Sequence, residues 1–402
     1  MPSVCFYFQV HQPYRLKHYS FFNIGNDHGY FDENLNREIL NKVADKCYIP
    51  ANRLMLDLIN RHKGKFKVSY SLSGVVLEQF EKYRPDVLDS FMELAKTGCV
   101  EFLSETYYHS LSFLYSKDEF LRQIELHKKK IKDLFNQEPK VFRNTELIYN
   151  NELADFVQKL GYKAILCEGA DHMLYGRTPN FLYTAPNNKQ IKCLLKNFRL
   201  SDDIAFRFSN TGWPEYPLTA PKYASWLHHY QDSADVINLF MDYETFGEHQ
   251  WESSGIFAFM EHLPSELLKN EKFDFKTVSE AADTYEAKDI YDVHSSISWA
   301  DSERDLSAWL CNSMQSESLS KLYALEEDVK RTRNKDIIEL WSKLQVSDHF
   351  YYMSTKYWSD GEVHKYFSPF NSPYDSYIFF INALSDLELL VNKQTIASTR
   401  LV

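Results

Sequence analysis

Short apolar runs alternate with longer amphipathic stretches along the N-terminal part of the chain. The runs are rich in Val, Ile, Leu and Phe, which is typical of strands buried on both faces. The amphipathic stretches repeat their apolar residues at helical spacing. Strands are predicted over 4–10, 66–72, 100–103, 140–142, 163–167 and 236–241, and helices over 51–61, 85–96, 117–135 and 151–160.

The repeated order of strand, helix and strand predicts a parallel sheet with right-handed crossovers. Closure of this sheet into a barrel would place every strand end on one face. The proline-rich stretch 178–230 breaks the rhythm, and we expect long loops and extra strands over the barrel mouth there. Helical patterns dominate beyond about residue 295, over 319–333, 335–344 and 376–392. We therefore predict an α/β barrel domain at 1–295 and a helical domain at 296–402.

The apolar run at 236–241 stops abruptly at a group of acids, aromatics and a histidine. Asp242 is the first polar side chain after this strand, and in parallel α/β architectures chemistry gathers where strands end. The same segment carries Glu244, His249 and Trp251. The alternative is a strand that runs into a solvated loop, since acids are common there.

Two more strands end in polar groups. The first ends at His11 and Gln12, so an imidazole and an amide would emerge beside Asp242, although a lone histidine is more often structural. Glu101 lies between apolar residues in the strand 100–103, and a buried carboxylate is costly unless it has a partner or a function. The segment after this strand includes Tyr107 and His109.

Arg143 and Glu146 follow the strand 140–142, where an ordinary surface ion pair is the alternative. Two carboxylates from different strands, Glu146 and Asp242, are what glycoside hydrolysis needs. One attacks the anomeric carbon while the other protonates the leaving oxygen. Glu146 would stay ionised beside Arg143, whereas an apolar strand and nearby acids would raise the pKa of Asp242.

Composition narrows the class of protein. A net charge of -11 argues against binding to the phosphate backbone of nucleic acid. No stretch approaches the roughly 20 apolar residues of a membrane span, and the start lacks signal-peptide features. Six scattered cysteines without a C-x-x-C pair favour reduced thiols, so we expect a cytoplasmic protein without nucleic-acid or membrane partners. Aromatic residues make up 16% of the chain, and such rings stack well on sugars.

These segments together resemble glycoside hydrolase family 57, the α-amylase and 4-α-glucanotransferase family. HQP at 11–13 matches its first signature, and GCVE at 98–101 matches a GQxE-like segment, with cysteine where glutamine is usual. The third signature matches around Glu146, and the D-x-E-x-F-G signature matches at 242–247. A fifth signature is placed near 298–301.

The resemblance implies an incomplete TIM-like (β/α)7 barrel, followed by a helical domain that helps to shape the cleft. It implies a retaining mechanism on α-glucosidic bonds, with Glu146 as the nucleophile and Asp242 as the general acid and base. The two carboxyl groups should then stand about 5 to 5.5 Å apart. His11 would hydrogen-bond the sugar where cleavage occurs. The other substrate-binding candidates are Gln12, Glu101, Tyr107, His109, Arg143, Glu244, His249, Trp213, Trp251 and Trp299.

We expect an α-glucan or maltooligosaccharide substrate, with no metal and no cofactor. A metal-dependent deacetylase on a related barrel needs an Asp-Asp strand end and an H-x-x-x-H helix. The only Asp-Asp pair lies at 202–203, in the irregular stretch, and no H-x-x-x-H occurs. A mannosidase-like site could still form if His11, Asp242 and His249 converged. Hydrolysis and glucan transfer share one glucosyl enzyme, so both stay open, as does a non-catalytic glycan-binding protein.

Overall fold

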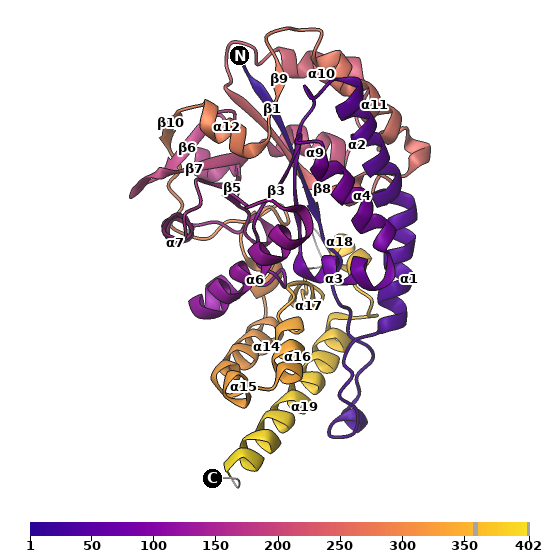
Figure 1. Ribbon diagram of the computed structural model, residues 1–402, viewed down its shortest axis with the longest axis vertical. Coiled ribbons are helices and arrows are strands. Elements are labelled where there is room, and N and C mark those ends of the chain that lie inside the picture. Colours follow the sequence, from indigo (N-terminus) through magenta and orange to yellow (C-terminus); the bar gives the residue numbers. More distant parts are fainter. Residues whose placement is uncertain (357–360, 400–402) are drawn as a thin grey trace.

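The computed structural model describes residues 1–356 and 361–399, and its core is a ring of parallel strands (Figure 1). The strands of the ring are β1 (Ser3–Val10), β2 (Val68–Leu72), β3 (Val100–Phe102), β4 (Val141–Phe142), β5 (Ala164–Glu168), β7 (Asn188–Lys196) and β8 (Val236–Asp242). Their order is β4, β5, β7, β8, β1, β2, β3. A parallel bridge between Ser104 and Phe142 joins β3 to β4 and closes the ring. The predicted seven-stranded (β/α) barrel is therefore confirmed.

Within the described residues, three further strands lie outside the ring. β6 (Leu182–Ala185) is antiparallel to β7, and β10 (Ala287–Ile290) pairs with β6. β9 (Asp274–Phe275) pairs with the first residues of β1. β6 and β10 widen the sheet on the side of β7, and β9 extends it beside β1.

Helices connect the barrel strands and cover the outside of the ring (Figure 1). Four of them agree with the prediction to within two residues at each end, because their apolar stripes are clear and each begins either with a proline in its first turn or with a capping side chain. The helices before residue 295 are α1 (Glu33–Val43), α2 (Ile49–Arg61), α3 (Gly74–Tyr83), α4 (Pro85–Lys96), α5 (Ser112–Tyr115), α6 (Lys117–Phe135), α7 (Asn151–Lys159), α8 (Asp171–Leu174), α9 (Phe198–Ala205), α10 (Ala220–His228), α11 (Ile256–Leu267) and α12 (Val278–Thr284).

The prediction for 178–230 is wrong in part. This stretch holds β6 and a long irregular segment at 206–219, but it also supplies the barrel strand β7 and the helices α9 and α10, which were not predicted. β7 begins with three polar residues, so its apolar run starts only at Ile191 and is too short to stand out. The prolines lie between these elements or in the first turn of α10, where Pro is tolerated.

The C-terminal region is helical, as predicted, and lies below the barrel in Figure 1. The helix predicted at 319–333 is two helices, which meet at Leu325. The division at 295/296 stays a prediction, and 357–360 and 400–402 of the predicted domain lie outside the described residues. The helices are α13 (Ser307–Leu310), α14 (Ser313–Ala324), α15 (Glu326–Thr332), α16 (Lys335–Lys343), α17 (Asp348–Tyr351), α18 (Gly361–Phe367) and α19 (Pro373–Thr399).

The helical region shares its hydrophobic core with a loop that follows β1. The buried side chains of Trp309 and Trp341 lie in the same apolar cluster as Tyr19 and Tyr30 of that loop. Asp386 of α19 is fully buried and accepts hydrogen bonds from the Tyr30 hydroxyl, at 2.8 Å, and from a backbone amide of the loop. The loop therefore fastens the helices to the barrel.

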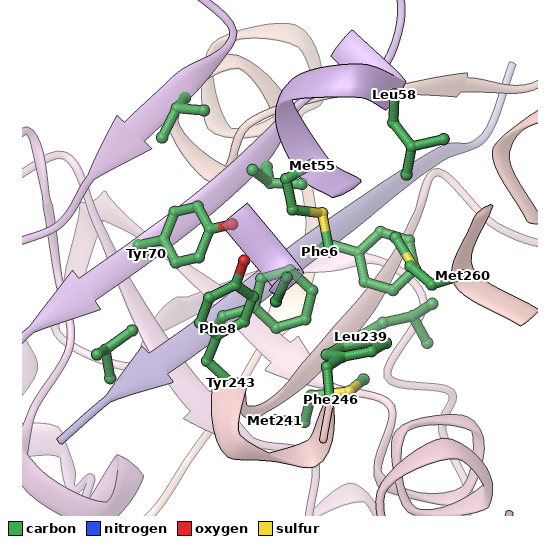
Figure 2. Close-up of a cluster of buried hydrophobic side chains, with 14 of the residues drawn as sticks. Phe6, Phe8, Met55, Leu58, Tyr70, Leu239, Met241, Tyr243, Phe246 and Met260 are labelled. Atoms are coloured by element: carbon green, nitrogen blue, oxygen red, sulfur yellow. The ribbon is translucent and has the colours of Figure 1, made fainter. Parts of the chain in front are cut away.

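Successive side chains along a barrel strand point alternately outward and inward, so the barrel has an outer hydrophobic core and an inner one. Phe6 and Phe8 of β1 and Leu239 of β8 face outward, against Met55 of α2 and Met260 of α11 (Figure 2). The residues between them along each strand point inward and belong to a second apolar cluster, which fills the barrel interior. Its members include Cys5, Tyr7, Leu166, Leu194 and Phe240. This inner layer closes the barrel below its mouth.

Five of the six cysteines are free and buried, as the composition predicted, whereas Cys311 is exposed. None of the helices in 1–356 and 361–399 has the length and apolarity that a membrane span requires.

Gly247 has a backbone conformation and surroundings that exclude a side chain. Its φ is +110°, and a Cβ at this position would lie 1.9 Å from the carbonyl oxygen of Lys46. We predict that Gly247→Ala lowers the free energy of unfolding by about 3 kcal/mol or more, since strain and a backbone clash add.

Gly98→Ala is the matched control, because Gly98 also has a positive φ, +71°, but a Cβ there would meet nothing within 4 Å. Gly98→Ala should lower the free energy of unfolding by about 1 to 2 kcal/mol. Denaturant unfolding of both variants measures the difference. Equal losses would show that the contact with Lys46 contributes nothing.

Candidate active site

Asp242 is the last residue of β8 and lies at the mouth of the barrel. Asp242 lies two positions after Phe240, so its side chain points to the same, inner side of the barrel. Its Cα pairs with that of Gln9 on β1, above the apolar inner layer. The side chain stays partly exposed. Burial raises the pKa of Asp242, and the charge of Glu146 raises it further, to about 6. Asp242 is therefore a carboxyl group that can hold a proton near neutral pH.

Glu146 follows β4 and is held in a backbone conformation that few non-glycine residues adopt. Its φ is 55°, and the next residue, Leu147, has a φ of 51°. The backbone amide of Trp299 donates to the carbonyl of Glu146 at 3.1 Å, which braces this turn from a distant segment. Strained residues of this kind gather at functional sites, where the surrounding structure holds them.

The Glu146 carboxylate accepts two hydrogen bonds. His109 Nε2 donates to one oxygen at 3.0 Å, and the indole Nε1 of Trp299 donates to the other at 2.7 Å. Burial alone would raise the pKa of Glu146, but these donors and the charges of His109 and Arg143 outweigh it, so the pKa lies below its usual value. The side chain remains 22% exposed. Glu146 is thus an ionised group that a ligand can reach.

His109 is a buried imidazolium between two carboxylates. Its Nδ1 lies 2.9 Å from an oxygen of Glu105, and its Nε2 bonds to Glu146. Burial would lower the pKa of His109, yet the two carboxylates raise it to about 9. Glu105 is fully buried, and despite that burial the bond and charge of His109 hold its pKa at about 2. Both ring nitrogens of His109 therefore carry protons at neutral pH.

His11 stacks on His109 and stays neutral. The ring centroids lie 4.0 Å apart with an interplanar angle of 20°. Burial and the charge of His109 lower the pKa of His11 in spite of the nearby Asp348 carboxylate. Its Nδ1 lies 2.7 Å from the Ser73 hydroxyl and its Nε2 lies 2.9 Å from Asp348 in α17. Both nitrogens are engaged within the protein, so the expected contact with a sugar stays a prediction.

The structure corrects the role predicted for Arg143. The guanidinium is fully buried, so it lies beneath the site and not among the groups that a substrate can touch. Its NH1 lies 4.0 Å from Glu105, and its Cζ lies 5.0 Å from the ring centroid of Trp299. The charge of Arg143 lowers the pKa of both Glu146 and Asp242. The guanidinium makes no hydrogen bond to either carboxyl group, so it influences both through its charge.

Two predicted residues line a hollow of about 390 Å³ farther along the same segment. Trp251 is 64% exposed, and its ring lies 6.0 Å from the Lys46 ammonium. Burial lowers the pKa of His249 to about 4, so this imidazole is neutral at neutral pH. The other lining residues are Ser209, Ser253 and Ser254. An indole can stack on the apolar face of a sugar, and imidazole and hydroxyl groups can hydrogen-bond to its hydroxyls.

Gln12 and Glu244 lie one layer behind the mouth. The Tyr48 hydroxyl donates to the Glu244 carboxylate, and the Gln12 amide lies 3.4 Å from the same hydroxyl. Gln12 also accepts a hydrogen bond from Arg15 at 2.9 Å. Burial, and then the charge of Asp242, raise the pKa of Glu244 to about 8. These two residues fasten the loops after β1 and β8 to each other.

Three predicted residues lie apart from the site. Glu101 does point into the barrel, but at its lower end, where it accepts from the backbone amide of Ser279 at 3.0 Å. Tyr107 packs on Gly74 and donates to Glu78 at 3.0 Å. Trp213 makes an edge contact with Trp226, at 6.2 Å between ring centroids. We find no role for these three at the mouth.

Sequence reasoning missed three residues that the site depends on. Glu105 precedes His109 by four positions, and a carboxylate after a predicted strand was a usable signal. Lys196 ends β7, which was not recognised as a barrel strand. Asp348 lies in a short helix 337 positions after His11, and nothing in its surroundings along the chain points to the site. Among the described residues, no group of three or more His, Cys, Asp or Glu side chains is arranged to hold a metal.

The arrangement is chemically asymmetric. Glu146 is ionised and reachable, while Asp242 can hold a proton at the same mouth. One group is suited to attack a carbon and the other to protonate a leaving oxygen.

The sequence model described as "Glycosyl hydrolase family 57" matches residues 5–294. A protein of Methanocaldococcus jannaschii named "Putative alpha-amylase" is 47% identical over 403 residues, covering 97% of this chain and 85% of that protein. "Alpha-amylase 1" of Dictyoglomus thermophilum is 23% identical over 51% of this chain and 29% of its own length.

Solved structures share the fold at low sequence identity. The branching enzyme of Pyrococcus horikoshii has a TM-score of 0.68 at 15% identity, over 91% of this chain and 87% of that one. The 4-alpha-glucanotransferase of Thermococcus litoralis has a TM-score of 0.63 at 18% identity, over 87% of this chain and 56% of that one. The barrel, the mouth and the match over 5–294 agree, and the chain is a member of glycosyl hydrolase family 57.

Proposed function

We propose that this protein is a retaining, α-amylase-like glycoside hydrolase that cleaves α-1,4-glucosidic bonds through a glucosyl-enzyme intermediate. One observation carries the proposal: Glu146 and Asp242 lie at the same mouth in environments that shift their pKa values in opposite directions. Family membership and the α-amylase name of the 47% identical relative support an α-glucan as the substrate.

In this mechanism Glu146 attacks the anomeric carbon while Asp242 protonates the glycosidic oxygen. The C–O bond to the leaving sugar breaks as the Glu146 ester forms. Asp242, now ionised, then takes a proton from water as this water attacks the anomeric carbon, and the bond between that carbon and the Glu146 oxygen breaks to release the carboxylate. The retained configuration requires a separation of about 5 to 5.5 Å between the two carboxyl groups, which stays a prediction.

The hydrogen bonds to Glu146 serve both steps. His109 and Trp299 hold the two carboxylate oxygens in fixed directions, so the nucleophile needs no reorganisation before it attacks. The same donors stabilise the carboxylate as it leaves in the second step. A neutral His11 stacked beside His109 keeps further charge away from this pocket.

Maltoheptaose, incubated with a chelator and without added metal, tests the activity. We predict that the wild type produces shorter sugars and that Glu146→Gln loses roughly 10⁴-fold or more in kcat, since the nucleophile is gone. Glu93→Gln, on the exposed face of α4, is the control and should keep full activity.

Chromatography of the products separates the alternatives. Shorter sugars alone mean hydrolysis, and longer sugars as well mean a 4-α-glucanotransferase. An unchanged substrate with the wild type would reject the α-glucan activity and favour a glycan-binding protein.

Azide tests the two roles by the configuration of the product. With Glu146→Gly and an activated α-maltosyl fluoride, azide should occupy the place of the nucleophile and give the β-glycosyl azide. With Asp242→Ala the β-glucosyl ester still forms from the fluoride, and azide attacks its opposite face to give the α-glycosyl azide. NMR of the purified products distinguishes the two anomers. Exchange of the two outcomes would show that the roles are reversed.

The pH profile follows from the two carboxyl groups. Asp242 must be protonated at the start, so kcat/KM should fall above a limb near pH 6, where this group ionises. Glu146 must be ionised, and its lowered pKa places the acidic limb below the usual range of a glutamate. Initial rates between pH 3 and about 9 measure both limbs. A rate that stays flat through pH 6 to 8 would rule out Asp242 as the acid.

A further inference from the structure

A second group of charged side chains lies beside the carboxylate pair, at the ends of two neighbouring strands. Glu168 ends β5, Lys196 ends β7, and their Cα atoms are partners in the sheet. Both side chains are buried, with Glu168 fully enclosed and Lys196 only 4% exposed. The mechanism above does not use either residue.

Two acids hold the Lys196 ammonium in place. Its Nζ lies 3.0 Å from an oxygen of Asp202 and 3.8 Å from an oxygen of Glu168. Arg304 approaches the same two acids, with NH1 3.4 Å from Glu168 and NH2 3.5 Å from Asp202. Burial of four charges is expensive and is weak evidence for a stabilising role, so such a group calls for another explanation.

The ammonium faces Trp299. Its Nζ lies 5.3 Å from the centroid of this indole, within the range of a cation–π contact. Trp299 is the residue that donates to Glu146, and Arg304 donates to its carbonyl oxygen at 3.3 Å. Arg304 also has a positive φ, 53°, so a strained backbone holds this loop against the acids.

Lys196 also lies beside the strand that carries Asp242. It pairs with Asn238 of β8, four positions before Asp242. A lysine that is packed between an indole and a catalytic strand can act on both carboxyl groups without touching the substrate.

We propose that Lys196 is a positioning residue of this site. Held by Asp202 and Glu168, its ammonium keeps the Trp299 indole directed at Glu146 and supplies the positive charge that allows Asp242 to give up its proton during turnover. This role deepens the proposed function and rests on it.

The charge balance around Asp242 supports this role. Burial and the charge of Glu146 raise the pKa of Asp242, whereas Arg143, Lys196 and His109 lower it. Without the ammonium, the proton would be held too tightly to leave in the first step. Burial also raises the pKa of Glu168, to about 7, so this acid can become neutral and leave Lys196 paired with Asp202 alone.

Lys196→Met tests the proposal, because it removes the charge and keeps most of the stem. NMR of protein labelled with 13C in the aspartate carboxyl groups gives the titration of Asp242 directly, its signal being the one lost in Asp242→Asn. We expect the Asp242 titration to move up by about one pH unit. We expect kcat on maltoheptaose to fall about 10- to 100-fold, because the indole donor is less well held.

Two further variants separate charge from packing. Lys196→Arg should keep the titration of Asp242 near its original position, since the charge remains. Lys192→Met is the matched control on the same strand, because Lys192 lies in the middle of β7 and donates to the carbonyls of Ala282 and Tyr285. It should lower thermal stability without moving the titration. Lys196→Gln makes the same prediction as Lys196→Met and serves if the latter does not fold.

The titration does not depend on turnover, so the two proposals can fail separately. A shifted Asp242 titration in a protein that never cleaves maltoheptaose would keep the role of Lys196 in setting Asp242 and reject the proposed activity. An unshifted titration in Lys196→Met would overturn the proposal even if the wild type is an active α-amylase.

Discussion

The site depends on two ion pairs that share one imidazolium, that of His109, between the carboxylates of Glu105 and Glu146. An imidazolium that bonds to a carboxylate on each side fixes the direction of Glu146 and keeps it ionised. This arrangement survives only because Glu105 and His109 are shielded from water, since the same pairs at a surface contribute little. The charge of His109 also explains why the neighbouring His11 stays neutral. In this stacked pair of rings, His109 is therefore protonated and His11 is neutral.

The barrel makes this arrangement possible by separating two layers along its axis. Apolar side chains such as Tyr7 and Phe240 close the interior, and the two carboxyl groups of the site lie above them. Groups that must meet a substrate, Glu146 and Asp242, remain partly exposed, whereas the groups that set their charge are buried beneath. The chemistry therefore lies at a boundary between a dry core and the solvent, where fixed charges act strongly.

Periodicity predicted most of the barrel, because six of its strands are short, mainly apolar runs that alternate with amphipathic helices. It missed β7, whose first residues are polar, and it could not tell how far up a strand a side chain lies. Glu101 shows this limit: its parity points it into the barrel, but it lies at the lower end, where it caps α12. Glu105, four positions later, has the role at the mouth. Asp348 could not be found at all, because its contact with His11 exists only in three dimensions.

The contact between His11 and Asp348 has a consequence for when the site is completed during synthesis of the protein. Asp348 is translated 337 positions after His11. Figure 1 places α17 between the barrel and the C-terminal helices, so the partner is in position only when both parts have packed. The surroundings of His11 are therefore complete only after Asp348 has been translated and α17 has packed against the barrel.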